Sequence, residues 1–170
     1  MLAEQICEIF NRCFAQSQVK LVGGASEPLY EPGEQESCIY FREDYASSAL
    51  HEIAHWCIAG ADRRQQPDYG YWYRDKRDIK QQRTFETVEV KPQSLEWIFS
   101  VAAGVGFRVS RDNFDESTLD MNEFSAEVHA AVIALLDGLP PRGERFIHAL
   151  VAQTGNKQAL KNGTYREPPK

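Results

Sequence analysis

Apolar residues recur with helical spacing near both ends of the chain. Residues 2–16 carry an apolar stripe that predicts an amphipathic helix, formed by Leu2, Ile6, Ile9, Phe10, Cys13 and Phe14. The same spacing predicts a helix that begins at Asp120 or Asn122, either of which can cap it, and ends at Leu136. A last helix is predicted at about residues 143–153.

Short runs of β-branched and aromatic residues predict strands. Residues 19–22 and 37–41 fit this pattern, and the stretch between them, rich in Gly, Pro and Glu, is interpreted as a loop. Residues 107–110 are interpreted as a third short strand. Helices and strands together predict an α+β fold, in which a small mixed sheet packs with several helices.

The most apolar helical pattern covers residues 44–60. Asp44 suits the N-cap position and Gly60 suits the left-handed position after the helix. Apolar residues occupy most sides of the predicted helix, namely Leu50, Ile53, Trp56, Cys57 and Ile58. We therefore expect a buried central helix rather than a surface one.

This predicted helix carries the pattern HExxH. His51 and His55 lie one turn apart on nearly the same face, about 6 Å along the helix axis. Two imidazoles placed in this way can bind one metal ion, and Glu52 beside them can handle a proton. Two histidines at this spacing alone usually reflect packing, but the glutamate, the apolar flanks and the helix end favour a metal site.

A third ligand is expected from residues 85–104, which form another strongly apolar stretch. Pro92 either opens a helix at its first turn or kinks one that has already begun. On one continuous helix Glu89 and Glu96 would share a face, about two turns apart. A carboxylate among so many apolar residues needs a partner, so we expect one of them to complete the metal site. Their spacing does not choose between them.

Residues 61–83 are basic and aromatic within an acidic protein. They carry seven Lys or Arg and four Asp, a net charge of +3. The stretch is interpreted either as a solvated loop whose aromatic rings pack on the core or as a recognition surface. Tyr71, Trp72 and Arg74 are the candidate substrate-binding residues.

Composition narrows the class of protein. A chain of 170 residues with 42% hydrophobic and 26% charged residues predicts one catalytic domain at residues 1–155, followed by a loose tail at residues 156–170. No apolar run has the length of a membrane span, so the cytoplasm is the expected location.

The net charge of −6 argues against direct binding of nucleic acid. The four cysteines lack CxxC spacing, which predicts free thiols.

Two histidines and one carboxylate suit two kinds of chemistry. With zinc, an acidified water attacks a carbonyl or phosphoryl group with Glu52 as the base, as in a peptidase or an endoribonuclease. With Fe(II), the same three ligands leave positions for dioxygen and substrate, and a C–H bond becomes hydroxylated. A non-catalytic binding module stabilised by metal is a third interpretation. Motif statistics alone favour the zinc hydrolase.

Four sequence runs change that balance. SALHEIAHWCIAG, DYGYWYRD, FETVEVKPQSLEWIFSVAAG and FRVSRDNF, spread over most of residues 37–155, resemble the bacterial elongation factor P hydroxylase family. The resemblance implies a zincin-like or endoribonuclease-like α+β fold and a non-haem iron centre. It also implies that the protein hydroxylates a lysine of translation elongation factor P that already carries a β-lysyl group.

The resemblance also implies roles for individual residues. His51 and His55 would bind Fe(II) together with Glu89 or Glu96, with Glu89 preferred, and Glu52 would orient a ligand or deliver a proton. Residues 63–83 would form a dock for the protein substrate, and their positive charge suits an acidic partner. The HxD signature of 2-oxoglutarate oxygenases is absent, so 2-oxoglutarate is not implied as a co-substrate.

Overall fold

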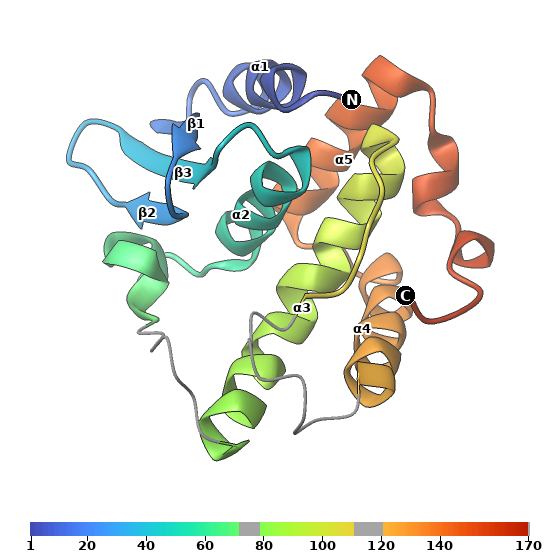
Figure 1. Ribbon diagram of the computed structural model, residues 1–170. Helices are drawn as coiled ribbons and strands as arrows, with labels where there is room; N and C mark the ends of the chain where they lie inside the picture. The colour runs from blue at the N-terminus through green and yellow to red at the C-terminus, as the bar shows by residue number, and fades with distance from the viewer. Residues whose placement is uncertain (72–78, 111–120, 170) are drawn as a thin grey trace.

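The computed structural model describes residues 1–71, 79–110 and 121–169. Within these ranges the chain forms five α-helices and one three-stranded sheet, which confirms the predicted α+β class (Figure 1). The helices are α1 (Ala3–Cys13), α2 (Ala46–Ile58), α3 (Ile79–Ala103), α4 (Met121–Leu136) and α5 (Pro141–Thr154). The strands are β1 (Val19–Ala25), β2 (Leu29–Glu31) and β3 (Ser37–Arg42). Trp72, Arg74 and Asp120 lie outside the described residues.

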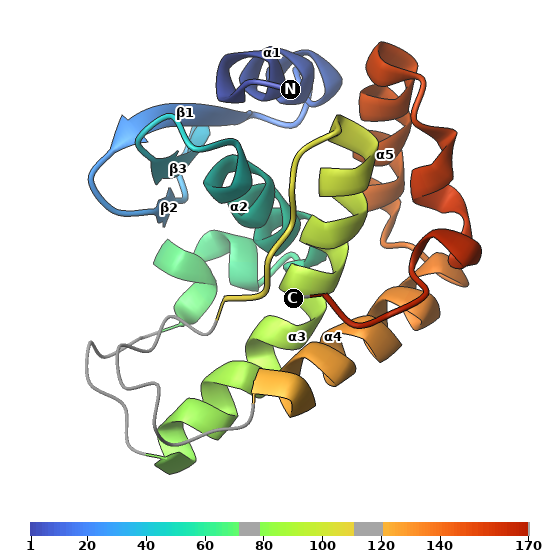
Figure 2. The ribbon, with the colours of Figure 1, turned by 45° about the vertical axis from the view of Figure 1, so that its right-hand side comes forward.

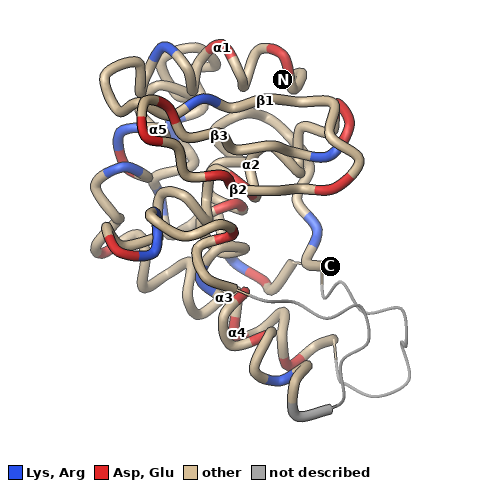
Figure 3. The backbone as a smooth tube through the Cα atoms, turned by 90° about the vertical axis from the view of Figure 1, so that its left-hand side faces the viewer, with Lys and Arg blue, Asp and Glu red and all other residues tan. Residues whose placement is uncertain are grey.

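The sheet is mixed, as predicted, with β3 at its centre. β3 runs parallel to β1 and antiparallel to β2. Seen toward the sheet, the strands lie one below another beneath α1, with α2 behind them (Figure 3). The prediction of a plain loop between β1 and β3 was incomplete, because Leu29 and Tyr30 pair with β3 there. Tyr30 is buried and anchors this short strand on the core.

Helix α2 lies between the sheet and helices α3 and α5 (Figures 1 and 2). Leu50, Ile53 and Ala54 are fully buried, which confirms the expectation of a central buried helix. An aromatic cluster holds α2 to its neighbours: the rings of Phe10 on α1 and Trp56 on α2 are 5.4 Å apart, and Phe10 also contacts Phe146 on α5.

Both predicted ends of α2 need correction. Tyr45, not Asp44, occupies the N-cap position, and Gly60 does not adopt the left-handed conformation. Two guanidinium groups replace the glycine cap. Arg142 donates to the carbonyl oxygens of Trp56, Cys57 and Ala59, and Arg64 also donates to that of Ala59. Because these arginines satisfy the last carbonyls of the helix, no left-handed residue is needed.

Helix α3 is continuous through Pro92, so the second interpretation of this proline is the right one: the helix had already begun. Helix α4 packs beside the first half of α3, and α5 packs beside its second half (Figure 2). Asn122 lies inside α4 rather than at its cap. None of the described helices is long and apolar enough to cross a membrane.

The prediction of a third strand at residues 107–110 was wrong. This extended segment runs back along α3 on the side of α2, without pairing to the sheet (Figure 2). The side-chain amide of Gln93 takes the place of a neighbouring strand. It donates to the backbone carbonyl of Ser110 at 2.5 Å and accepts from the Ser110 N–H at 2.9 Å.

Residues 157–165 are mostly exposed, but two buried residues, Ala159 and Tyr165, hold them on the core, which differs from the expected loose tail. They form two short 3-10 helices, η3 (Lys157–Leu160) and η4 (Asn162–Thr164), and lead to Tyr165, which is 2% exposed. The Tyr165 hydroxyl donates to the Ala159 carbonyl at 2.9 Å, and its ring meets that of Trp97 edge-on at 5.0 Å. The imidazole of His129 lies 2.8 Å from the Tyr165 carbonyl oxygen.

We expect Tyr165→Ala to lower the free energy of unfolding by about 3 kcal/mol, because it removes a buried aromatic ring and leaves a cavity against Trp97. Tyr165→Phe removes only one hydrogen bond and should cost about 1 kcal/mol. Urea unfolding measures both values. Tyr45→Ala is the control, because that side chain is exposed and should cost less than about 0.5 kcal/mol. Equal stability of the Tyr165→Ala variant and the parent protein would contradict the observed packing.

Candidate metal centre

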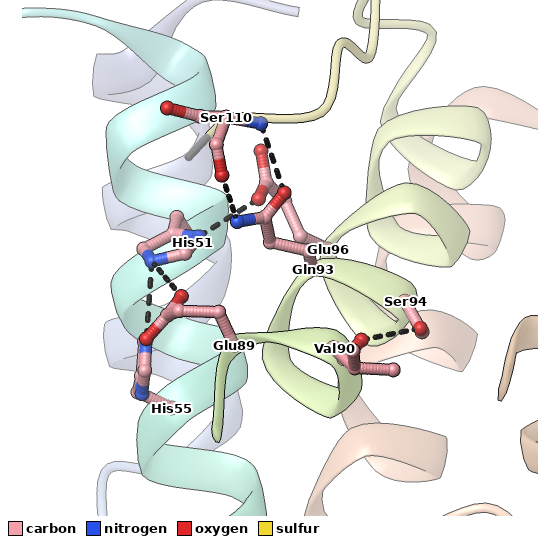
Figure 4. Close-up of polar contacts among 8 residues, drawn as sticks. All are labelled: His51, His55, Glu89, Val90, Gln93, Ser94, Glu96 and Ser110. Carbon is pink, nitrogen blue, oxygen red and sulfur yellow. Dashed lines mark hydrogen bonds and ion pairs between the residues drawn. The ribbon is translucent and has the colours of Figure 1, made fainter. Parts of the chain in front are cut away.

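Helices α2 and α3 bring two histidines and one glutamate together (Figure 4). The Nε2 atoms of His51 and His55 are 3.0 Å apart. The Nε2 atom of His51 lies 3.4 Å from Oε2 of Glu89, and that of His55 lies 3.4 Å from Oε1. The side chain of Glu89 is 3% exposed. The rings of His51 and His55 thus turn the same nitrogen toward one point, as the spacing in HExxH predicts.

The positions of these three groups fit a metal ion. Two atoms bonded to one ion at about 2.1 Å are about 3.0 Å apart at a right angle and about 3.4 Å apart at the tetrahedral angle. The observed separations are similar to these values, although the two histidines lie 3.4 Å from different oxygens of Glu89, His51 from Oε2 and His55 from Oε1. Two imidazole nitrogens and one carboxylate could therefore hold an ion. This donor set suits both zinc and ferrous iron.

Glu96 lies on the other side of His51. Its carboxylate is 2.8 Å from Nδ1 of His51, the nitrogen that points away from His55 and Glu89 (Figure 4). A carboxylate in this position holds a proton on Nδ1 and keeps the lone pair of Nε2 directed at the site. The two glutamates that sequence spacing could not separate therefore occupy different places, and Glu89 shares the point on which the Nε2 atoms converge.

The charges around His51 alter its affinity for a proton. Burial alone would lower the pKa of His51. The hydrogen bond from Glu96 and the negative charges of Glu96, Glu89 and Glu52 outweigh burial and raise the pKa to about 10. In the metal-free protein this imidazole is therefore protonated at neutral pH, and a metal ion has to displace that proton.

Glu52 lines the same pocket but does not belong to the group of three ligand atoms. Burial raises the pKa of its carboxyl; the positive charges of His51 and His55 act against this rise, and the carboxylates of Glu89 and Asp68 add to it. Its position beside the converging nitrogens would let it accept a proton or bind a positively charged group.

A pocket of about 570 Å³ opens over these residues. Tyr71, one of the three candidate substrate-binding residues, lines it and stacks under the guanidinium of Arg63 at 4.4 Å. Trp72 and Arg74 lie outside the described residues and cannot be placed in it. The pocket is large enough to admit an extended side chain together with the metal centre.

Tyr69, Gln93 and Arg108 are among the residues of this pocket that sequence reasoning did not name as candidate site residues. A polar Gln93 inside an apolar helical stretch was the available sign, since a buried amide needs partners. Tyr69 sits between Asp68 and Gly70, a turn composition that could have marked a bend toward the site. We find no local sequence sign for Arg108.

Comparison with known proteins gives one consistent family. The model of a family described as elongation factor P hydroxylase matches residues 9–164. The chain is also 47% identical to the elongation factor P lysine hydroxylase of Haemophilus influenzae, over 155 residues that cover 88% of this chain and 87% of that protein. The resemblance carried by the four sequence runs is thereby confirmed. The chain belongs to the elongation factor P hydroxylase family.

Proposed function

We propose that this protein hydroxylates a lysine side chain of elongation factor P at an iron centre. The observation that carries the proposal is the convergence of His51, His55 and Glu89 on one point in a member of this family. The Haemophilus relative is named for the same reaction on a lysine. The substrate lysine is proposed to carry a β-lysyl group already, which a pocket of about 570 Å³ can accommodate.

The proposed ligands are the Nε2 atoms of His51 and His55 and the carboxylate of Glu89. A bound Fe(II) would supply the redox chemistry that places one atom of dioxygen into a C–H bond, and three protein ligands leave coordination positions free for this. Overall, hydroxylation also consumes two electrons and two protons and releases the second oxygen atom as water. The electrons come from a reductant.

The chain's own residues would hold this centre in place. Glu96 fixes the ring of His51, and the pairing of Gln93 with Ser110 holds the wall formed by residues 105–110. Helix α2 directly follows the central strand β3, which supports a zincin-like arrangement of metal helix and sheet. We propose the cytoplasm as the location, where a translation factor would be met.

The basic and aromatic stretch at residues 63–83 is proposed as the dock for elongation factor P. Within its described part, Tyr71 lines the pocket and Arg63 covers its ring, so the stretch begins at the edge of the site. Exposed arginine there would attract an acidic protein partner. Trp72 and Arg74 are proposed as part of this dock on the basis of the sequence alone.

The direct test is mass spectrometry of elongation factor P from cells that lack this protein. We expect the peptide with the modified lysine to lose the mass of one oxygen atom and to regain it when the gene is restored. In vitro, protein freed of metal should recover activity with Fe(II), a reductant and air. Unchanged peptide mass in the deleted strain would contradict the proposal.

The zinc-hydrolase alternative makes the opposite prediction for metal and oxygen. Such an enzyme would be active with Zn²⁺ under strictly anaerobic conditions and would cleave a peptide or RNA. We expect the zinc-loaded protein to leave elongation factor P unhydroxylated and uncleaved. Cleavage by the anaerobic zinc form would favour the alternative.

A further inference from the structure

The hydroxyl group of Tyr69 is a buried polar group that the metal centre does not explain. The residue is 4% exposed, and its hydroxyl has no hydrogen-bond partner within the described part of the chain. An unsatisfied buried group of this kind costs about 1–3 kcal/mol. Because Tyr69 lines the pocket with His55 and Glu52, a ligand in that pocket could supply the missing partner.

The backbone around Tyr69 is held in an unfavourable conformation. Asp68 and Tyr69 have φ angles of 46° and 57°, in the left-handed region that residues other than glycine rarely adopt, and Gly70 follows at 74°. Such strain persists only where surrounding contacts impose it, and it is often found at functional sites. Here Asp68 accepts a hydrogen bond from the N–H of Tyr30 at 2.8 Å, and Arg63 donates to the carbonyl of Tyr69.

Ring stacking fixes the side chain as well. The ring of Tyr69 lies 4.3 Å from that of Tyr30, nearly parallel to it, and its plane is also nearly parallel to the imidazole of His55 at 6.2 Å. The phenol is thus held at a defined place beside a proposed metal ligand. A group placed so rigidly is well suited to position a ligand.

Carboxylates outnumber guanidinium groups around the pocket. Five acidic residues line it, against Arg42 and Arg108, and these acids are Glu27, Glu52, Asp68, Glu89 and Glu96. Glu89 and Glu96 are engaged by the histidines. No hydrogen bond or ion pair of the Glu52 side chain is found among the described residues. Glu52 and Tyr69 line the same pocket.

These features suit one class of ligand. A carboxylate and a phenol oxygen accept hydrogen bonds, and a primary ammonium group has three N–H donors and a positive charge to offer both. Aromatic rings beside them add attraction for a cation. An anionic ligand would meet repulsion from Glu52, and a neutral ligand would gain no attraction from its charge.

We propose that the Glu52 carboxylate and the Tyr69 hydroxyl form a subsite for a primary ammonium group at the end of a flexible side chain. The subsite lies beside the metal centre, on the side of the turn at residues 67–70. The identification of the natural ligand as a modified lysine rests on the proposed function. The preference of the subsite for a cation does not.

The test uses n-pentylamine as the probe and the metal-loaded protein. Calorimetric titration should show weak, saturable binding of the amine and no binding of n-pentanol, which has the same length without the charge. Glu52→Gln, which keeps the shape of the side chain, should weaken amine binding at least about 10-fold. Tyr69→Phe keeps the ring stack and should weaken it about 3- to 10-fold. Metal content should stay unchanged in both variants.

Two control variants match these changes. Glu8→Gln removes one negative charge from the exposed face of α1, and Tyr30→Phe removes the other hydroxyl of the ring stack, which donates to the Arg64 carbonyl and does not line the pocket. Both should bind the amine as tightly as the parent protein. Amine binding unaffected by Glu52→Gln, or pentanol binding as well as pentylamine, would overturn the subsite.

The experiments distinguish a failure of the subsite proposal from a failure of the proposed function. If the amine binds as expected while elongation factor P gains no oxygen, the subsite stands and the proposed function fails. If elongation factor P is hydroxylated but Glu52→Gln and Tyr69→Phe change neither amine affinity nor KM, the function stands and the subsite fails. A rise in KM that exceeds the fall in kcat in Tyr69→Phe would support a binding role.

Discussion

Replacing His55 with alanine should abolish stable iron binding and lower the kcat/KM of hydroxylation at least about 1000-fold, or about 4 kcal/mol of transition-state stabilisation. The reason is geometric. The Nε2 atom of His55 lies 3.0 Å from that of His51 and 3.4 Å from Glu89, so its removal leaves two ligands on one side of the ion. Metal analysis and a mass-spectrometric assay of elongation factor P measure the two losses.

The matched control is His148→Ala on α5, where the side chain is exposed. This variant should keep its iron and its activity, because it removes an imidazole far from the converging nitrogens. Circular dichroism should show both variants folded, since the side chain of His55 supports packing less than Ile53 and Ala54 beside it, which are fully buried. A full equivalent of tightly bound iron in His55→Ala would refute the proposed ligand set.

The position of the two histidines was predictable because it depends on local geometry. Helical spacing alone places His51 and His55 on one face, and the apolar residues around them predict that the helix is buried. The two candidates for the third ligand show the limit of such reasoning. Glu89 and Glu96 share a face of α3, and only the crossing of α2 and α3 decides that Glu89 lies at Nε2 and Glu96 at Nδ1 of His51.

Two of the wrong predictions share a cause, which is pairing between residues far apart in the sequence. Residues 107–110 have the composition of a strand, but the amide of Gln93 takes the backbone bonds of Ser110. Gly60 suits a helix end, but Arg142, 83 positions after Ala59 in the chain, donates to the Ala59 carbonyl and so helps to satisfy the end of the helix. Local propensity fails at such places because tertiary contacts outweigh it.

The C-terminal segment follows the same rule. Its composition, with polar residues and two prolines, gives no periodic apolar stripe. One aromatic residue, Tyr165, nevertheless anchors it by contacting Trp97 on α3 and approaching His129 on α4. A single buried ring can offset part of the ordering cost of the residues around it. A single buried aromatic residue produces no periodic pattern in the sequence, so an analysis of periodicity does not predict it.

Replacing Glu96 with glutamine should weaken metal binding about 10- to 100-fold, the usual effect of removing a carboxylate that supports a ligating histidine. Two consequences of the change oppose each other. Loss of the negative charge makes Nε2 of His51 a poorer ligand. It also lowers the raised pKa of His51, so that fewer protons compete with the metal at neutral pH. The magnitude known for such variants indicates that the first consequence is the larger.

Because these two consequences oppose each other, the difference in metal affinity between the parent protein and Glu96→Gln should depend on pH. In the parent protein the pKa of His51 is raised to about 10, so each pH step from 7 toward 10 relieves proton competition and strengthens metal binding. In Glu96→Gln that relief is smaller because the pKa is lower, and the gap in affinity should widen as pH rises. Calorimetric titration with Zn²⁺ in buffers of different ionisation enthalpy measures both the affinity and the protons released, and Glu8→Gln is the control. The parent protein should release more protons at pH 7.5 than the variant does; equal release would mean that Glu96 does not set the protonation of His51.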